Sequence, residues 1–193
     1  MVEEHTAEIT SRERIRLLVE GKLPYDEVKK MIKLLLKDQD RFWKYLEVLQ
    51  ARVLWKDQIL LRISEHLYIV QKEGGPRVVK CDCGQEFGDY RANWKLGCRI
   101  RVRTTPEELA EIFVTARRLN PGELVEIREF YCPGCLAQLA VEVVPPGYPI
   151  QFEFLPDLDR FYRQWLERPL PDEPPGGLED RTSDQTAQWA REA

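Results

Sequence analysis

The chain has 193 residues, of which 43% are hydrophobic and 32% charged, enough for one sizeable core or two small lobes. Its net charge of −4 and its pI of about 5.4 exclude the broad basic surface that general binding of nucleic acid or anionic lipid requires. The sequence has no apolar run near the roughly 18 residues of a membrane span, and its start lacks the apolar core of a secretory signal. We therefore expect a cytoplasmic protein that binds neither membranes nor nucleic acid.

Three short helices are predicted at the N-terminus. Thr10 followed by Glu13 has the pattern of a capping box, and Gly21 is typical of a helix end. A second helix follows, with apolar residues at helical spacing. The third is expected to begin with Asp40 as its cap and to end near Trp55.

The hydrophobic period then changes to that of β-strands. Residues 60–63 and 66–71 are short apolar runs rich in β-branched and aromatic side chains, which predict two strands. Arginine alternates with isoleucine and valine over residues 99–103, which predicts another strand. Residues 124–131 and 136–144 flank a pair of cysteines and are predicted to form a hairpin.

Helical segments are expected inside and after this β region. The Thr-Pro-Glu-Glu run at residues 105–108 is typical of a helix start, and this helix is expected to stop at residues 120–122. A last helix is predicted over residues 157–167. Beyond it, residues 170–193 are acidic and carry too little apolar surface to offset the entropy of ordering, which predicts a mobile tail or partner-dependent arm.

Four cysteines form two close pairs, Cys81 with Cys83 and Cys132 with Cys135, each in a predicted turn beside strands. Disulfides are rare in reducing compartments, so metal binding is the leading interpretation. Zinc takes four ligands in a tetrahedron, and two turns rich in Gly or Pro can each aim two thiolates at one ion. A closed four-thiolate site has no open position for substrate, so we expect a structural zinc that contributes on the order of 10 kcal/mol to folding.

Two other roles are compatible with cysteines at this spacing. The Cys132-Pro133-Gly134-Cys135 spacing is also that of thioredoxin-like enzymes, but their motif opens a helix, whereas strands are predicted on both sides here. Iron in a rubredoxin-like site would use the same four ligands, and the sequence leaves that alternative open. Cys98 is expected to be a small buried residue without chemistry.

The remaining candidates for chemistry have simpler interpretations. Arg99, Arg101 and Arg103 are predicted to share one face of a strand, where they could grip phosphates, but a solvated sheet face is the favoured interpretation. His5 and His66 have no second ligand or nucleophile nearby in sequence. With no phosphate-binding glycine motif and no acid, base and nucleophile set, we predict no catalytic and no cofactor-binding residue.

The predicted fold is α+β, in four segments. Residues 1–57 form an N-terminal helical segment, and residues 58–149 form a zinc-ribbon-like antiparallel β lobe with one inserted helix. Residues 150–169 form a C-terminal docking helix, and residues 170–193 form the flexible acidic tail. Because such short helices are marginal alone in water, we expect partner subunits to cover the N-terminal helices and residues 148–165, with Trp165 as an anchor and the zinc lobe as a rigid spacer.

Several ordered motifs over roughly residues 22–170 resemble the small gamma subunit of bacterial acetone carboxylase and its acetophenone carboxylase relatives. These motifs are Arg41-Phe42, Glu47-Val48-Leu49-Gln50, Tyr68-Ile69-Val70-Gln71, Cys81-Asp82-Cys83-Gly84, Asn93-Trp94-Lys95-Leu96, Arg128-Glu129-Phe130-Tyr131-Cys132-Pro133 and Phe161-Tyr162-Arg163-Gln164-Trp165-Leu166. The resemblance places the four cysteines at the family's zinc positions. One departure is Leu136, since the family usually has glycine after the last cysteine.

The resemblance also implies a function for the complex. It implies an ATP-dependent enzyme that activates a ketone and bicarbonate by phosphorylation and joins them into a β-keto acid. ATP, a divalent metal and the chemistry would belong to large hydantoinase-like subunits, in a hetero-oligomer with two copies of each subunit, and this chain would be a non-catalytic part. The alternative is a free zinc-ribbon module that binds nucleic acid or a regulatory protein, which the acidic charge disfavours.

Overall fold

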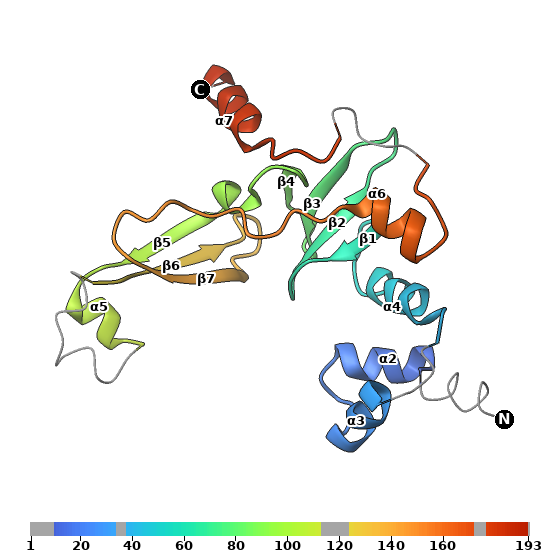
Figure 1. Cartoon of the computed structure of the whole chain (residues 1–193). Coiled ribbons are helices and arrows are strands. Elements are labelled where there is room, and N and C mark those ends of the chain that lie inside the picture. The colour runs from blue at the N-terminus through green and yellow to red at the C-terminus, as the bar shows by residue number, and fades with distance from the viewer. Residues whose placement is uncertain (1–9, 34–37, 113–123, 172–176, 193) are drawn as a thin grey trace.

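Two antiparallel sheets form the centre of the computed structural model, which describes residues 10–33, 38–112, 124–171 and 177–192 (Figure 1). The first sheet, here called sheet A, has the strand order β1-β2-β3-β4, and the second, sheet B, has the order β5-β6-β7. Sheet A contains β1 (Gln58–Arg62), β2 (Leu67–Gln71), β3 (Arg77–Cys81) and β4 (Glu86–Asp89). Sheet B contains β5 (Arg99–Arg103), β6 (Glu126–Tyr131) and β7 (Gln138–Val144). The predicted β lobe is therefore divided into two sheets, and strands β3 and β4 are not among the predicted ones.

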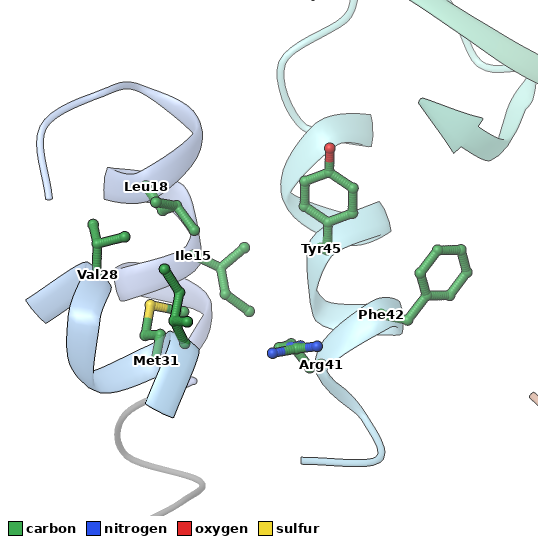
Figure 2. A pocket seen from close by; sticks show the side chains of 8 residues that line it. Ile15, Leu18, Val28, Met31, Arg41, Phe42 and Tyr45 are labelled. Carbon is green, nitrogen blue, oxygen red and sulfur yellow. The ribbon is translucent and has the colours of Figure 1, made fainter. Parts of the chain in front are cut away.

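The three N-terminal helices are present as α2 (Arg12–Val19), α3 (Tyr25–Lys33) and α4 (Arg41–Gln50). The cap of α2 is Ser11 and not Thr10, because the Ser11 hydroxyl accepts from the Arg14 amide while the Thr10 hydroxyl donates to Asp38 over 2.6 Å. The three helices surround an open, mostly apolar hollow of about 360 Å³ (Figure 2). Its lining residues are Ile15, Leu18, Val28, Met31, Ile32, Arg41, Phe42 and Tyr45.

Helix α4 ends at Gln50, earlier than the predicted end near Trp55. The reason is the Gln50 side chain, which donates to the Asp57 carbonyl and accepts from the Ile59 amide. These two hydrogen bonds turn the chain from α4 into β1. The predicted Asp40 cap lies at the correct position, but its side chain makes no capping hydrogen bond.

Sheet A is covered on both faces. On one face, Leu46 and Leu49 of α4 pack with Tyr68, Val70 and other apolar residues of the strands. The opposite face is covered by the C-terminal segment, which consists of α6 (Leu158–Arg160) and a π-helical turn (Phe161–Trp165) in place of one regular helix. Both central strands are consequently buried along almost their whole length.

Two buried side chains attach the C-terminal segment to sheet A. Leu158 and Tyr162 are each 1% exposed, and the Tyr162 hydroxyl donates to the Leu60 carbonyl over 2.7 Å. This segment was expected to dock on a partner, and that expectation is wrong for these two residues. Sheet A offers the apolar surface that they need within the same chain.

One helix, α5 (Pro106–Ala110), packs against sheet B. This inserted helix begins with the predicted capping box, in which Thr105 and Glu108 exchange hydrogen bonds. Its residue Leu109 packs on Ile127 of β6. The predicted end of this helix at residues 120–122 lies outside the described residues. A 3-10 turn (Trp94–Gly97) joins sheet A to sheet B.

The C-terminal tail contains a helix, α7 (Thr182–Glu192), where an unstructured segment was expected. The chain before it is held by three polar contacts with the loop after β4. The Arg181 amide donates to the Arg91 carbonyl, the Asn93 amide donates to the Thr182 hydroxyl, and the Arg91 guanidinium donates to the Gly177 carbonyl. None of the α7 residues is buried, in keeping with the low apolar content of the tail. Hydrogen bonds, which composition does not reveal, position this segment.

None of the helices in the described ranges is both long and apolar enough to cross a membrane.

Candidate metal centre

Four cysteines from two turns meet at the junction of the two sheets. Cys81 ends β3 and Cys83 lies in the turn to β4, whereas Cys132 and Cys135 lie in the turn between β6 and β7. The four sulfur atoms all lie within 4.8 Å of one another. The sequence pairs are therefore brought together as predicted, and the cluster links sheet A to sheet B.

The sulfur separations match a tetrahedral metal site. The Cys81 and Cys135 sulfurs are 3.8 Å apart, and those of Cys83 and Cys132 are 3.7 Å apart. A tetrahedron with metal–sulfur bonds of about 2.3 Å has edges of about 3.8 Å, whereas a disulfide bond measures about 2.05 Å. All the cysteines are free thiols. The four are thus arranged to hold one metal ion, and both the ligand type and the spacing are consistent with zinc.

Burial and backbone amides act in opposite directions on these thiols. Burial raises the pKa of Cys81 above the ordinary thiol value. Burial acts in the same direction on Cys132, but the amides of Cys135 and Gly134 donate to its sulfur and bring the pKa of Cys132 below that value. Amides that stabilise a thiolate are a usual feature of turns that bind metal ions. The second turn therefore favours the charged form that a metal requires.

Neighbouring side chains fix the first cysteine turn. The Trp55 indole donates to the carbonyls of Cys81 and Asp82, each over 3.1 Å. The Asp82 carboxylate lies 2.8 Å from the His66 ring, and the Asp82 amide donates to the His66 carbonyl. The role of His66 was missed, because its partner lies across the β2–β3 pair and nothing in the local sequence indicates that contact.

The second cysteine turn contains a residue in left-handed conformation. Leu136 has φ of 61°, and its amide donates to the Cys132 carbonyl over 2.9 Å. This conformation favours glycine. The observation explains why glycine would suit the position after the last cysteine, and it shows that leucine there still allows the four thiols to converge.

Cys98 does not belong to the thiol cluster. It is half-buried against the core on the cluster side of sheet A, with its sulfur 3.8 Å from the Trp94 carbonyl. Burial raises the pKa of Cys98 to about 12. A thiol with that pKa is protonated at neutral pH, which agrees with the expected role as a packing residue.

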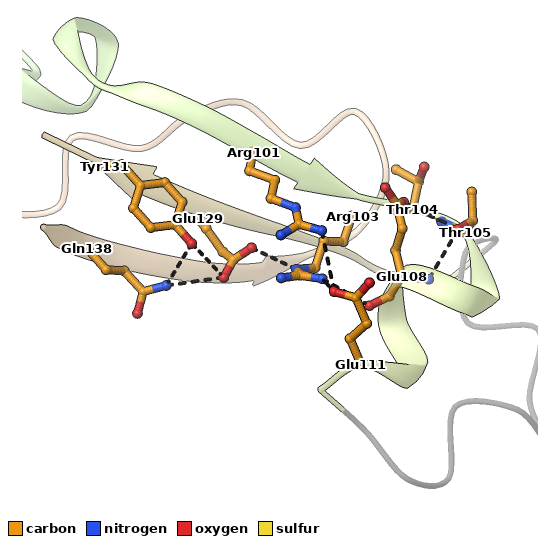
Figure 3. Close-up of polar contacts among 9 residues, drawn as sticks. All are labelled: Arg101, Arg103, Thr104, Thr105, Glu108, Glu111, Glu129, Tyr131 and Gln138. Carbon is orange, nitrogen blue, oxygen red and sulfur yellow. Dashed lines mark hydrogen bonds and ion pairs between the residues drawn. The ribbon is translucent and has the colours of Figure 1, made fainter. Parts of the chain in front are cut away.

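Two of the three arginines of β5, Arg101 and Arg103, contact carboxylates of the same chain (Figure 3). The Arg103 guanidinium donates to Glu129 over 2.7 Å and also pairs with Glu111. Arg101 lies 3.4 Å from Glu111. These hydrogen bonds from Arg103 hold the pKa of Glu129 and of Glu111 below its usual range. These contacts leave no free set of three arginines for a phosphate. The expected solvated face is found for Arg99 and Arg101, whereas Arg103 is buried.

Comparisons with known proteins find one matching family model and two similar carboxylase subunits. The family model described as acetone carboxylase gamma subunit matches residues 53–166. The acetone carboxylase gamma subunit of Xanthobacter autotrophicus is 39% identical over 163 residues, which cover 84% of this chain and 96% of that protein. The acetophenone carboxylase beta subunit of Aromatoleum aromaticum is 37% identical over 79 residues, which cover 40% of this chain and 61% of that protein.

Proposed function

The chain belongs to the acetone carboxylase gamma subunit family, and on that premise we propose that it is a small structural subunit of an ATP-dependent ketone carboxylase. In this proposal large hydantoinase-like subunits bind ATP and a divalent metal, and they carboxylate a ketone with bicarbonate to a β-keto acid. The complex is cytoplasmic and contains two copies of each subunit. This chain contributes one structural zinc, held by Cys81, Cys83, Cys132 and Cys135.

The position of the cysteine cluster carries the proposal. It joins two sheets whose cysteines are far apart in the chain, and four thiolates complete the coordination of zinc. A site of this kind fixes structure and leaves no position for a substrate. In the part of the chain that the structure describes, these cysteines are also the only group of three or more His, Cys, Asp or Glu residues placed to hold a metal. Catalysis is therefore assigned to the partner subunits.

Exposed apolar residues support docking on those subunits. Trp165 is 78% exposed although its neighbour Tyr162 is buried, so the π-helical turn presents one large aromatic side chain to the outside. Ile32 of α3 is 67% exposed beside the apolar hollow of the N-terminal helices. Large aromatic residues are frequent anchors of protein interfaces. We assign Trp165 and the N-terminal helices to the interface, whereas Leu158 and Tyr162 belong to the internal core.

Purification of the chain from its native source tests the proposed function. We expect two kinds of large subunit to accompany it, and we expect ketone-dependent ATP hydrolysis by the complex but not by the isolated chain. Assays with acetone, acetophenone and other ketones identify the substrate. Activity of the pure chain, or purification without large subunits, would contradict the proposal.

Substitution of the exposed tryptophan tests the interface separately. Trp165→Ala should weaken assembly by about 2 kcal/mol, in line with truncation of interface anchors, while leaving the zinc content unchanged. Trp189→Ala on α7 is the matched control, since Trp189 is also partly exposed but lies in the tail. Affinity measured by titration of each variant with the large subunits distinguishes the two sites. Unchanged affinity of Trp165→Ala would remove Trp165 from the interface.

A further inference from the structure

The outer edge of sheet B, formed by β5, is open. Strand β5 pairs with β6 on one side, and in the described residues no backbone hydrogen bond is formed on its other side. Its first four residues are all exposed, including Ile100 at 38% and Val102 at 43%. A strand with exposed β-branched side chains and free backbone groups is a template for another strand.

The β5 edge lacks the irregularities found in the pairing of the other edge strands. The register between β5 and β6 is continuous, whereas the pairings of β1, of β4 and of β7 with their neighbours each contain a register shift. Bulges commonly protect sheet edges from unwanted pairing. The regular edge at β5 is thus the one best suited to accept an added strand.

The charges of β5 select the kind of strand that fits. Arg99 and Arg101 lie on one face, and Ile100 and Val102 lie on the other. Arg101 is held only loosely by Glu111, at 3.4 Å with its side chain 48% exposed. Arg99 forms no ion pair with any described residue. Arg99 therefore has no carboxylate partner among the described residues, and Arg101 has a single long contact that leaves its guanidinium able to accept another carboxylate.

A second copy of the chain is a poor occupant. Antiparallel pairing of two β5 strands centred on Arg101 would place Arg101 opposite Arg101 and Arg99 opposite Arg103. Like charges directly opposite one another in a sheet are destabilising. A strand that alternates acidic and apolar residues would instead meet the arginines with carboxylates and meet Ile100 and Val102 with apolar side chains.

We propose that β5 binds an extended segment of a large subunit, with alternating acidic and apolar residues, by addition of a strand to sheet B. The proposal rests on the proposed function, because it assumes that the large subunits are partners. Beyond the proposed function, it specifies where one large subunit binds and which side chains recognise it. Main-chain hydrogen bonds would give affinity, and the two arginines would give specificity.

Amide exchange measured on the wild-type chain tests the proposal without any substitution. Exchange is compared between the isolated chain and the purified complex with the large subunits. We expect β5 amides to become protected in the complex, and β7 amides at the opposite edge to change little. A complex in which the β5 amides stay unprotected would overturn strand addition while leaving the proposed function intact.

Charge variants test the specificity. The double variant Arg99→Glu with Arg101→Glu should weaken binding of the large subunits about tenfold or more, because like charges would then face each other across the interface. Arg99→Lys with Arg101→Lys should retain most of the binding, and Val141→Thr with Val143→Thr on β7 is the control for the opposite edge. Zinc content checks that each variant is folded.

The remaining outcomes separate the two proposals. If the glutamate variant binds the large subunits as tightly as wild type, the acidic strand is excluded. Protection of β5 that appears in the isolated chain and increases with its concentration would identify a second copy as the occupant and overturn the proposal. If the wild-type chain binds no large subunit, the proposed function fails and the β5 proposal fails with it.

Discussion

Sheet A and sheet B differ in the kind of side chain that they bury. In sheet A the buried side chains of the central strands are mainly apolar, with Leu67, Ile69 and Val79 in the core under the C-terminal segment. In sheet B the buried side chains include charged residues on neighbouring strands, and several valines and isoleucines are exposed. The buried charged residues of sheet B are Arg103, Glu126, Arg128, Glu129 and Glu142.

This difference indicates that sheet A is stabilised mainly by its own apolar core, whereas sheet B is not. Burial of apolar surface stabilises sheet A directly. Buried ion pairs contribute much less, because the cost of removing charges from water offsets their attraction. We therefore expect sheet B to depend more than sheet A on the proposed metal and on the proposed partner contacts.

Loss of the metal should have the largest effect, and it should fall mainly on sheet B. A four-thiolate zinc site contributes on the order of 10 kcal/mol, and Cys132→Ser removes one of its ligands. We expect amides of β6 and β7 to exchange much faster in this variant, with those of β2 and β3 less affected. Cys98→Ser is the control and should keep its zinc. Equal loss of protection in both sheets would show that they unfold as one unit.

Truncation of apolar residues should distinguish the sheets by several-fold. Leu60 is fully buried in sheet A, so Leu60→Ala should lower the free energy of unfolding by about 2–5 kcal/mol. Val141 in sheet B is half exposed, so Val141→Ala should change the free energy of unfolding by no more than about 0.5 kcal/mol. Chemical denaturation of the isolated zinc-bound chain measures both values. Similar costs at both positions would contradict the contrast.

A buried ion pair allows a test inside the sheet B region. The Lys95 ammonium lies 2.6 Å from Glu142 and 3.0 Å from Glu153, and both the Lys95 and Glu142 side chains are buried. Lys95→Met should destabilise the chain by about 3 kcal/mol, because it removes the hydrogen-bonded partner of the buried Glu142 carboxylate and leaves only Arg128 at 3.8 Å. Lys95→Met combined with Glu142→Leu should restore most of that loss. Failure of the double variant to recover would mean that the pair itself is strongly stabilising.

The left-handed residue in the metal turn predicts a smaller gain. Leu136→Gly should stabilise the chain by about 0.5–1 kcal/mol, since glycine adopts positive φ without strain and the leucine side chain is largely exposed. The stability of Leu136→Asn should lie between those of wild type and Leu136→Gly, because asparagine tolerates this conformation better than leucine does. Thermal unfolding of the three zinc-bound proteins measures their order of stability. A loss of stability in Leu136→Gly would indicate that the leucine side chain packs against something in solution.

Acid should produce the smallest of these effects. Hydrogen bonding from Arg103 holds the pKa of Glu129 below its usual range, so this contribution is present above the unfolded pKa, near about 4.3, and is lost as the pH falls through the folded pKa. Glu129→Gln should therefore flatten the dependence of unfolding free energy on pH over this acidic range. Exposed Glu65→Gln should leave the dependence unchanged. An identical slope in wild type and Glu129→Gln would exclude this linkage.

Local sequence determined much of this fold. Hydrophobic period and turn residues placed the three N-terminal helices, five of the strands and the start of α5. The spacing of Cys81 with Cys83 and of Cys132 with Cys135 predicted that these four thiols form one cluster, because two close pairs in turns are typical of metal sites. Each of these features is set by residues close together in the sequence, so one sequence is enough to predict them.

Only the tertiary structure decided how the elements are divided and attached. The separation into two sheets, the docking of Tyr162 under sheet A and the polar contacts that hold the start of α7 all join residues far apart in sequence. The end of α4 at Gln50 likewise depends on hydrogen bonds to Asp57 and Ile59 across a turn. Periodicity shows that a strand or helix has an apolar face, but it does not show which surface will cover that face. That choice depends on the free energy of the whole packed chain, which local patterns do not contain.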